Sequence, residues 1–174
     1  MENAEAGFDI NKDYDTAENK KNICPEKGFI LDHYVTRSLR HPDPLICDKK
    51  VENLRTLYST ILRPVAIHYA DQQDGVQCCL NILCGLCSQS YAVSALSGHA
   101  LSRHIYGEAV DFYITGVTAR QVFDDIRSKK INLTYGVLSL NTGYIHVTLP
   151  YTFKGKRIQG LTVQGDPRGT NIFD

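Results

Sequence analysis

The chain has 174 residues and zero formal net charge, with 19 Lys and Arg against 19 Asp and Glu. Its length suits one domain with a hydrophobic core, since domains cluster at about 100–150 residues. The 43% of hydrophobic and 22% of charged residues are ordinary globular usage and exclude a wholly disordered chain. A neutral chain lacks the basic surface of a nucleic-acid binder, and no apolar run reaches the ~18 residues of a membrane helix. We therefore expect no nucleic-acid partner and no membrane span. The first residues also lack the basic and apolar regions of a secretory signal.

The first half of the chain is predicted to be helical after a polar arm. Residues 1–27 mix charges and contain little to bury, so we expect a flexible N-terminal arm. Apolar residues at helical spacing predict a short helix over 29–39. A second helix is predicted from Asp48, as its N-cap, to about residue 65, with an interruption at Pro64. A turn over 71–75 then leads to an apolar strand over 76–84.

The second half of the chain is predicted to be mostly strands. Small and polar residues over 85–103 indicate a long irregular loop. A strand over 107–114 is followed by a helix that Thr118 can cap, and strands over 133–140 and 143–149 are joined by a hairpin turn. Helices that come first and strands that come later predict an α+β fold, with N-terminal helices packed on a small antiparallel sheet. The expected domain covers residues 28–165, and residues 166–174 form a tail.

Six cysteines allow more than one interpretation. An even number suits disulfides only in a secreted protein. Cys84-Gly-Leu-Cys87 has the spacing of a metal knuckle or a redox pair, but no second such pair follows it. Cys78, Cys79 and Cys84 lie in an apolar run, where reduced cysteine behaves as a small buried hydrophobe. We expect these three to be packing residues, and a metal site built on the cysteines is the alternative.

Two strand segments carry the candidate site residues. Alternation along 107–112 puts Asp111 on one face with two small residues, and alternation along 143–149 puts His146 on the face opposite the apolar side chains. If the two strands share a sheet, Asp111 and His146 meet, with His104 at the mouth of the preceding loop. Two imidazoles and a carboxylate can bind zinc and leave one position open, as catalytic zinc sites do. Taken singly, each residue is more simply a hydrogen-bonded histidine or a solvated aspartate.

The pattern Ser102-x-His104-x-x-Gly107-x-Ala109-x-Asp111, followed by the strand Tyr144-Ile-His146-Val, resembles the zinc D-alanyl-D-alanine carboxypeptidase family of peptidoglycan metallopeptidases. This family shares its fold with Hedgehog domains. The segment 53–64 is similar to the N-terminal helix of short bacteriophage-like members, so the resemblance spans roughly residues 28–150.

The resemblance implies a ligand set and an activity. It implies one zinc ion per chain, held by His104, Asp111 and His146, with Ser102 beside the substrate. It also implies hydrolysis of peptide bonds in peptidoglycan stem peptides, as a carboxypeptidase or an endopeptidase. Such an activity would act on the cell wall, for example when a bacteriophage penetrates or lyses its host.

The chain departs from this family at two functional positions. Gly143 and Thr148 stand where family members carry an acidic residue, and residues 85–88 contain no arginine where the family binds the substrate carboxylate. The general base is therefore unassigned. Glu108 is expected to point away from Asp111, and His99 is an alternative proton carrier. The second hypothesis is a catalytically degenerate zinc-binding module that acts in binding or in virion structure.

Overall fold

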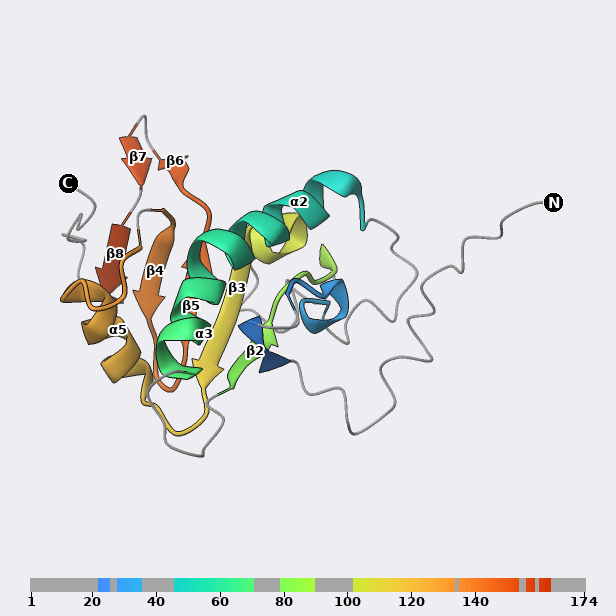
Figure 1. Ribbon diagram of the computed structural model, residues 1–174. Helices are drawn as coiled ribbons and strands as arrows, with labels where there is room; N and C mark the ends of the chain where they lie inside the picture. Colours follow the sequence, from blue (N-terminus) through green and yellow to red (C-terminus); the bar gives the residue numbers. More distant parts are fainter. Residues whose placement is uncertain are drawn as a thin grey trace.

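The computed structural model of the protein describes residues 22–25, 28–35, 46–70, 79–89, 102–133, 135–153, 156–158 and 160–163. Helices and strands are mixed in it, and most neighbouring strands are antiparallel, which confirms the α+β class (Figure 1). Within these residues no helix has the length and apolar character needed to cross a membrane.

The main sheet has the strand order β1-β2-β3-β5-β4-β8. Its strands are β1 (Asn22–Ile23), β2 (Leu80–Cys84), β3 (Ala109–Ile114), β4 (Val137–Leu140), β5 (Ile145–Thr148) and β8 (Gly160–Val163). All neighbours pair antiparallel except β4 and β8, which run parallel. This parallel pair was not predicted. It arises because the separate hairpin of β6 (Tyr151–Phe153) and β7 (Lys156–Ile158) precedes β8 and lets the chain return alongside β4.

The predicted helix from Asp48 is present, with its interruption just before Pro64. It consists of α2 (Asp48–Leu57), a π-helical turn over Tyr58–Leu62, and α3 (Arg63–Ala70). Pro64 lacks the N–H that a helix ladder requires, and a π turn is one way to absorb such a break. The N-cap is Cys47 rather than Asp48, and it makes no side-chain capping bond. Asp48 instead sits in the first turn, where a carboxylate favours the helix dipole.

The helices pack on the apolar face of the sheet. Figure 1 shows the α2–α3 helix running across the strands, with α5 (Ala119–Arg127) beside β4. Alternate residues of the strands and the inward faces of the helices form one buried cluster, which includes Leu54, Ile61, Phe112, Phe123 and Leu138. The predicted cap of α5 is confirmed, because the Thr118 hydroxyl accepts a hydrogen bond from the N–H of Gln121 at 3.1 Å. This packing leaves the opposite face of β3 and β5 for the polar residues.

The helix predicted over 29–39 is not found in its described part, residues 29–35. A single 3-10 turn forms there, over Leu31–His33, and residues 36–39 lie outside the described residues. The residues after it are held by another segment instead, because the Tyr34 carbonyl accepts a hydrogen bond from Leu86 N–H at 2.6 Å and Val35 forms a bridge with Leu86. The sheet also begins earlier than expected, since β1 falls within the predicted arm and pairs with β2.

Several other sequence predictions fall on residues that the structure does not describe. They concern the arm before residue 22, the turn over 71–75, Cys78, most of the predicted loop, and the tail over 166–174.

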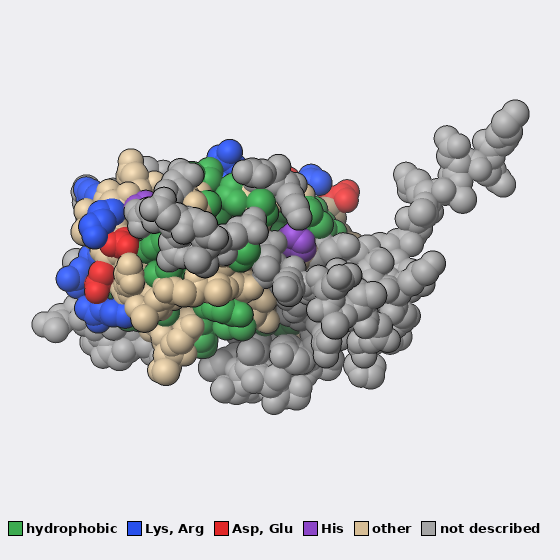
Figure 2. All heavy atoms as spheres, turned by 60° about the horizontal axis from the view of Figure 1, so that its bottom comes forward, with side chains coloured by type: hydrophobic (Ala, Val, Ile, Leu, Met, Phe, Trp, Pro, Cys, Tyr) green, Lys and Arg blue, Asp and Glu red, His purple; other side chains and the backbone are tan. Residues whose placement is uncertain are grey.

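Charged side chains of both signs lie next to each other on the face drawn in Figure 2. Two ion pairs involve α5: Arg120 pairs with Asp124 at 2.8 Å, and Asp125 pairs with Lys130, which lies just beyond the helix, at 2.8 Å. This mixture agrees with the zero net charge of the chain.

Asp125 carries a testable contribution to stability. Its carboxylate accepts hydrogen bonds from the Tyr69 hydroxyl at 2.7 Å and the Lys130 ammonium at 2.8 Å. Burial acts to raise the pKa of Asp125, but these two bonds outweigh it and hold the pKa below its usual value. The stabilisation is therefore present above the unfolded-state pKa of about 4 and is lost as pH falls through the lower folded-state pKa.

We expect Asp125→Ala to lower the free energy of unfolding by about 1–3 kcal/mol near neutral pH. The difference in the free energy of unfolding between Asp125→Ala and the wild type should become smaller at acidic pH, as measured by urea unfolding over a series of pH values. The matched control is Asp124→Ala, which removes an exposed ion pair worth less than about 1 kcal/mol. Equal losses in the two variants would contradict this interpretation.

Candidate metal site

Three polar residues form a row across the centre of the sheet. In the strand register Asp111 of β3 lies opposite His146 of β5 on one side and opposite Cys84 of β2 on the other. Directly opposed residues of antiparallel strands project from the same face. Asp111 and His146 thus lie together, as strand alternation predicts, on the face away from Val110 and Phe112.

Asp111 contacts both histidines, one with each carboxylate oxygen. Its Oδ1 lies 2.6 Å from His146 Nδ1, and its Oδ2 lies 3.5 Å from His104 Nε2. The two imidazole rings are 5.3 Å apart between centroids. His104 and Asp111 are buried, with 3% and 7% of their surface exposed, whereas the His146 side chain is 32% exposed. His146 is therefore the member of the group that solvent reaches most easily.

A short turn before β3 positions His104. The residue belongs to a 3-10 turn over Arg103–Tyr106, which ends at Gly107 with a φ of 66°. A side chain is strained at that φ, and a Cβ there would meet the Lys50 carbonyl oxygen at 2.5 Å. Glycine is thus required for the chain to leave the turn and enter β3 with His104 beside Asp111.

A backbone carbonyl fixes the ring of His104. Its Nδ1 lies 2.9 Å from the Gly85 carbonyl oxygen, which can only accept, so Nδ1 carries the proton. Burial lowers the pKa of His104, against the opposing effects of Asp111 and two backbone groups, and favours the neutral ring. A neutral ring protonated at Nδ1 presents the Nε2 lone pair towards Asp111. The Nε2 atom of His104 and the Oδ2 atom of Asp111 lie 3.5 Å apart, and together they can bind a cation.

Cys84 is buried, as its predicted packing role requires, but it lies beside His104 and Asp111 and outside the main hydrophobic cluster. Leu80 and Ile82 of β2 face the core, and uninterrupted alternation would send Cys84 there too. The register instead shifts between Ile82 and Cys84, leaving Leu83 as an extra, exposed residue. A β-bulge of this kind re-aims the side chains that follow it. The sulfur of Cys84, one ring nitrogen of His104 and one oxygen of Asp111 all lie within 4.8 Å of one another and can hold a metal ion.

Cys87 stands beside the group without belonging to it. It is buried, its thiol is a hydrogen-bond neighbour of Cys84, and its N–H donates to the His104 carbonyl at 3.3 Å. None of the cysteines within the described residues forms a disulfide. Of them, Cys79 is only half-buried, so the packing role predicted for it is at most partial.

The remaining predicted residues lie around this group. Ser102 precedes the 3-10 turn and is half-buried, without a side-chain capping bond. Glu108 forms an ion pair with Arg103 at 2.9 Å, which agrees with the expectation that it is not directed at Asp111. His99 lies outside the described residues. Burial raises the pKa of Tyr144, and the charges of Asp111 and Cys84 raise it further, so this hydroxyl lies within electrostatic reach of the site and stays protonated.

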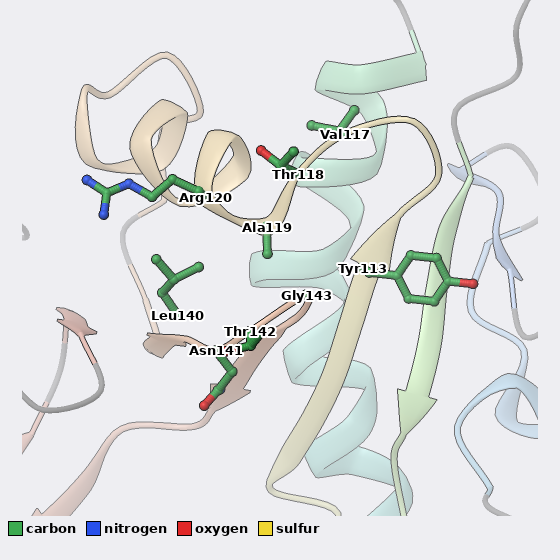
Figure 3. A pocket seen from close by; sticks show the side chains of 9 residues that line it. All are labelled: Tyr113, Val117, Thr118, Ala119, Arg120, Leu140, Asn141, Thr142 and Gly143. Carbon is green, nitrogen blue, oxygen red and sulfur yellow. The ribbon is translucent and has the colours of Figure 1, made fainter.

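A groove of about 610 Å³ opens at one end of the sheet, beyond the site (Figure 3). It lies between the start of α5 and the β4–β5 turn and is lined by Tyr113, residues 117–120 and residues 140–143. Tyr113 is two residues beyond Asp111 on the same strand face, a separation of about 7 Å. Gly143 also lines this groove.

No protein-family model, curated protein or solved structure matches the chain. What the chain does must therefore be inferred from the site itself and from the sequence pattern that supplies its residues.

Proposed function

We propose that the protein is a zinc-dependent hydrolase that cleaves peptide bonds in peptidoglycan stem peptides, with zinc held by His104, Asp111 and His146. The observation that carries this proposal is the Asp111 carboxylate, which contacts His146 with one oxygen and faces the Nε2 of His104 with the other. These residues are those of the sequence pattern that resembles the peptidoglycan metallopeptidases. One zinc ion per chain follows from one such group.

The donor atoms suit zinc. Imidazole nitrogen, carboxylate oxygen and thiolate sulfur are the ligands that zinc takes in proteins, whereas calcium and magnesium prefer oxygen alone. The bond from His104 to the Gly85 carbonyl is the outer contact that metal-binding histidines usually make. Zinc bound here would supply a Lewis acid that polarises the scissile carbonyl and acidifies water.

The protein's own groups would position the substrate and donate a proton. Tyr144 stands just before β5 and two residues before His146, so strand alternation puts it on the same face. Burial raises the pKa of its hydroxyl, which is protonated at neutral pH. It is therefore a hydrogen-bond donor for the oxygen on which negative charge develops. The groove beyond Tyr113 offers apolar surface together with Arg120 and Asn141, which suits a short peptide. No arginine stands at residues 85–88, so we expect cleavage of internal bonds as well as terminal ones.

The second candidate is a zinc-binding module without catalysis. This candidate is favoured by Glu108, the acidic residue nearest to Asp111 in the sequence, because its carboxylate forms an ion pair with Arg103. The Arg103 guanidinium also lies over the Tyr151 ring, 3.9 Å from its centroid, so both Arg103 and Glu108 are engaged in contacts of their own. Within the described residues, Asp111 is the only carboxylate of the group that can hold a metal.

Incubation of the zinc-loaded full chain with purified muropeptides separates the two candidates. We expect new peptide products by mass spectrometry, abolished by His146→Ala together with the loss of bound zinc. Tyr144→Phe should retain zinc and reduce turnover by about 10²–10³-fold, the usual cost of one oxyanion donor. If the zinc-loaded protein binds muropeptides but cleaves none, with its cysteines either reduced or oxidised, the non-catalytic module is the correct function. Equal turnover in Tyr144→Phe would remove that residue from the mechanism.

A further inference from the structure

We propose that Cys84 is a fourth ligand of the metal ion and that Cys87 is its redox partner. A disulfide between the two cysteines then removes the sulfur ligand and frees one coordination position on the metal. This inference rests on the proposed metal site but not on peptide hydrolysis. The sequence resemblance implies three ligands and assigns no role to either cysteine.

The placement of Cys84 supports the ligand role. The bulge at Leu83 turns Cys84 out of the core and puts it opposite Asp111, with 6% of its surface exposed. Its sulfur, a His104 nitrogen and an Asp111 oxygen all lie within 4.8 Å of one another. Three atoms at such separations can surround one metal ion, since zinc bonds to sulfur and nitrogen are about 2.0–2.3 Å long. His146 is not one of these three residues, but it contacts Asp111 at 2.6 Å. With His146 as the ligand that the proposed function assigns, the site has four protein ligands, the number that closes a tetrahedral zinc site.

The segment that follows Cys84 is anchored to the same site. The Gly85 carbonyl accepts from His104, Leu86 N–H donates to the Tyr34 carbonyl at 2.6 Å, and Cys87 N–H donates to the His104 carbonyl at 3.3 Å. These bonds bring the Cys87 thiol next to that of Cys84, inside the protein, with the two-residue spacing of dithiol redox pairs. A second buried thiol beside a metal ligand is not needed for binding by that ligand. It does provide the second thiol that a reversible disulfide switch requires.

The oxidation balances with a peroxide as the oxidant. The Cys87 sulfur attacks one peroxide oxygen, so that an S–O bond forms, the O–O bond breaks and one water leaves. The Cys84 sulfur then attacks the Cys87 sulfur. An S–S bond forms, the S–O bond breaks, and hydroxide takes up a proton and leaves as a second water. Two electrons pass from the two sulfurs to the peroxide, and a dithiol reductant reverses the change.

The consequence is a change in coordination number. In the reduced protein four ligands occupy the metal, which is the arrangement of a structural site. In the oxidised protein His104, Asp111 and His146 remain, and the freed position is the one a catalytic site keeps open. Oxidation would therefore convert a closed metal centre into an open one without unfolding the domain.

Cobalt binding to the full chain tests the ligand role. Reduced wild-type protein loaded with Co²⁺ should show the near-ultraviolet charge-transfer band of a thiolate ligand. Cys84→Ser should lose that band. Its metal affinity should fall by at least about 10–100-fold, because even the loss of a hydrogen bond to a metal ligand typically costs that much. Cys87→Ser is the matched control and should keep both the band and the affinity. A band unchanged in Cys84→Ser would overturn the proposal.

Peroxide treatment tests the switch on the same samples. Wild-type protein should lose two hydrogen atoms by mass, yield a peptide with Cys84 linked to Cys87, lose the charge-transfer band and retain about one equivalent of metal. Cys87→Ser should not form this link. Formation of the disulfide with the band intact, or with complete release of metal, would contradict the proposal. Muropeptide hydrolysis is scored separately on the reduced and on the peroxide-treated protein. A protein that shows the thiolate band when reduced but cleaves nothing in either state would refute the hydrolase and leave the four-ligand site standing.

Discussion

Asp111→Asn is expected to abolish metal binding while leaving the fold intact. Asparagine has the shape of aspartate but no charge, and Asp111 is the carboxylate that contacts both His104 and His146. Loss of an outer contact to a metal ligand costs about 10–100-fold in affinity, so loss of a charged ligand should exceed that. Zinc content after dialysis should fall from one equivalent to none.

Thermal unfolding with and without zinc gives a second readout of the same change. A ligand that binds only the folded state stabilises it, by about 2.7 kcal/mol when its free concentration is 100 times Kd. Wild-type protein should gain this stabilisation and Asp111→Asn should not. The control is Asp124→Asn, which makes the same chemical change at an exposed position of α5. Full zinc binding by Asp111→Asn would place the metal elsewhere in the chain.

The part of the site that the sequence predicts is the part set by local periodicity. Residues two apart on a strand share a face, so Asp111 and His146 are placed by alternation along β3 and β5 without knowledge of any other segment. The start of α5 is equally local, since Thr118 bonds the N–H three residues later. In each case the face of the strand or the cap of the helix is set within the segment that carries the residue. The contact between Asp111 and His146 depends in addition on the pairing of β3 with β5.

The parts that the sequence does not predict depend on partners far along the chain. The bulge at Leu83 is defined only by the register of β2 against β3, so nothing within residues 80–84 shows that Cys84 faces Asp111. The same is true of β8, whose parallel pairing with β4 follows an intervening hairpin. The segment at Tyr34 leaves its helical pattern because Leu86 bonds to it across the fold.

Gly85→Ala is expected to destabilise the fold and weaken the metal site together. A Cβ at Gly85 would overlap the Tyr34 carbonyl oxygen, which is backbone and cannot rotate aside. The crowded segment would have to move, at a cost of about 1–3 kcal/mol for overpacking and about 1 kcal/mol for each hydrogen bond broken. The bonds at risk are those from Leu86 to Tyr34 and from His104 to Gly85.

The second bond links this loss of stability to metal binding. Once Gly85 moves, its carbonyl no longer orients the His104 ring, and zinc affinity should fall by about 10–100-fold. Urea unfolding and chelator competition measure the two effects. The control is Gly143→Ala, where φ is 84° but no atom lies within 4 Å of a Cβ. It should cost only the backbone strain of about 1–2 kcal/mol and leave zinc affinity unchanged. A Gly85→Ala protein with normal zinc affinity would show that the Gly85 carbonyl does not position His104.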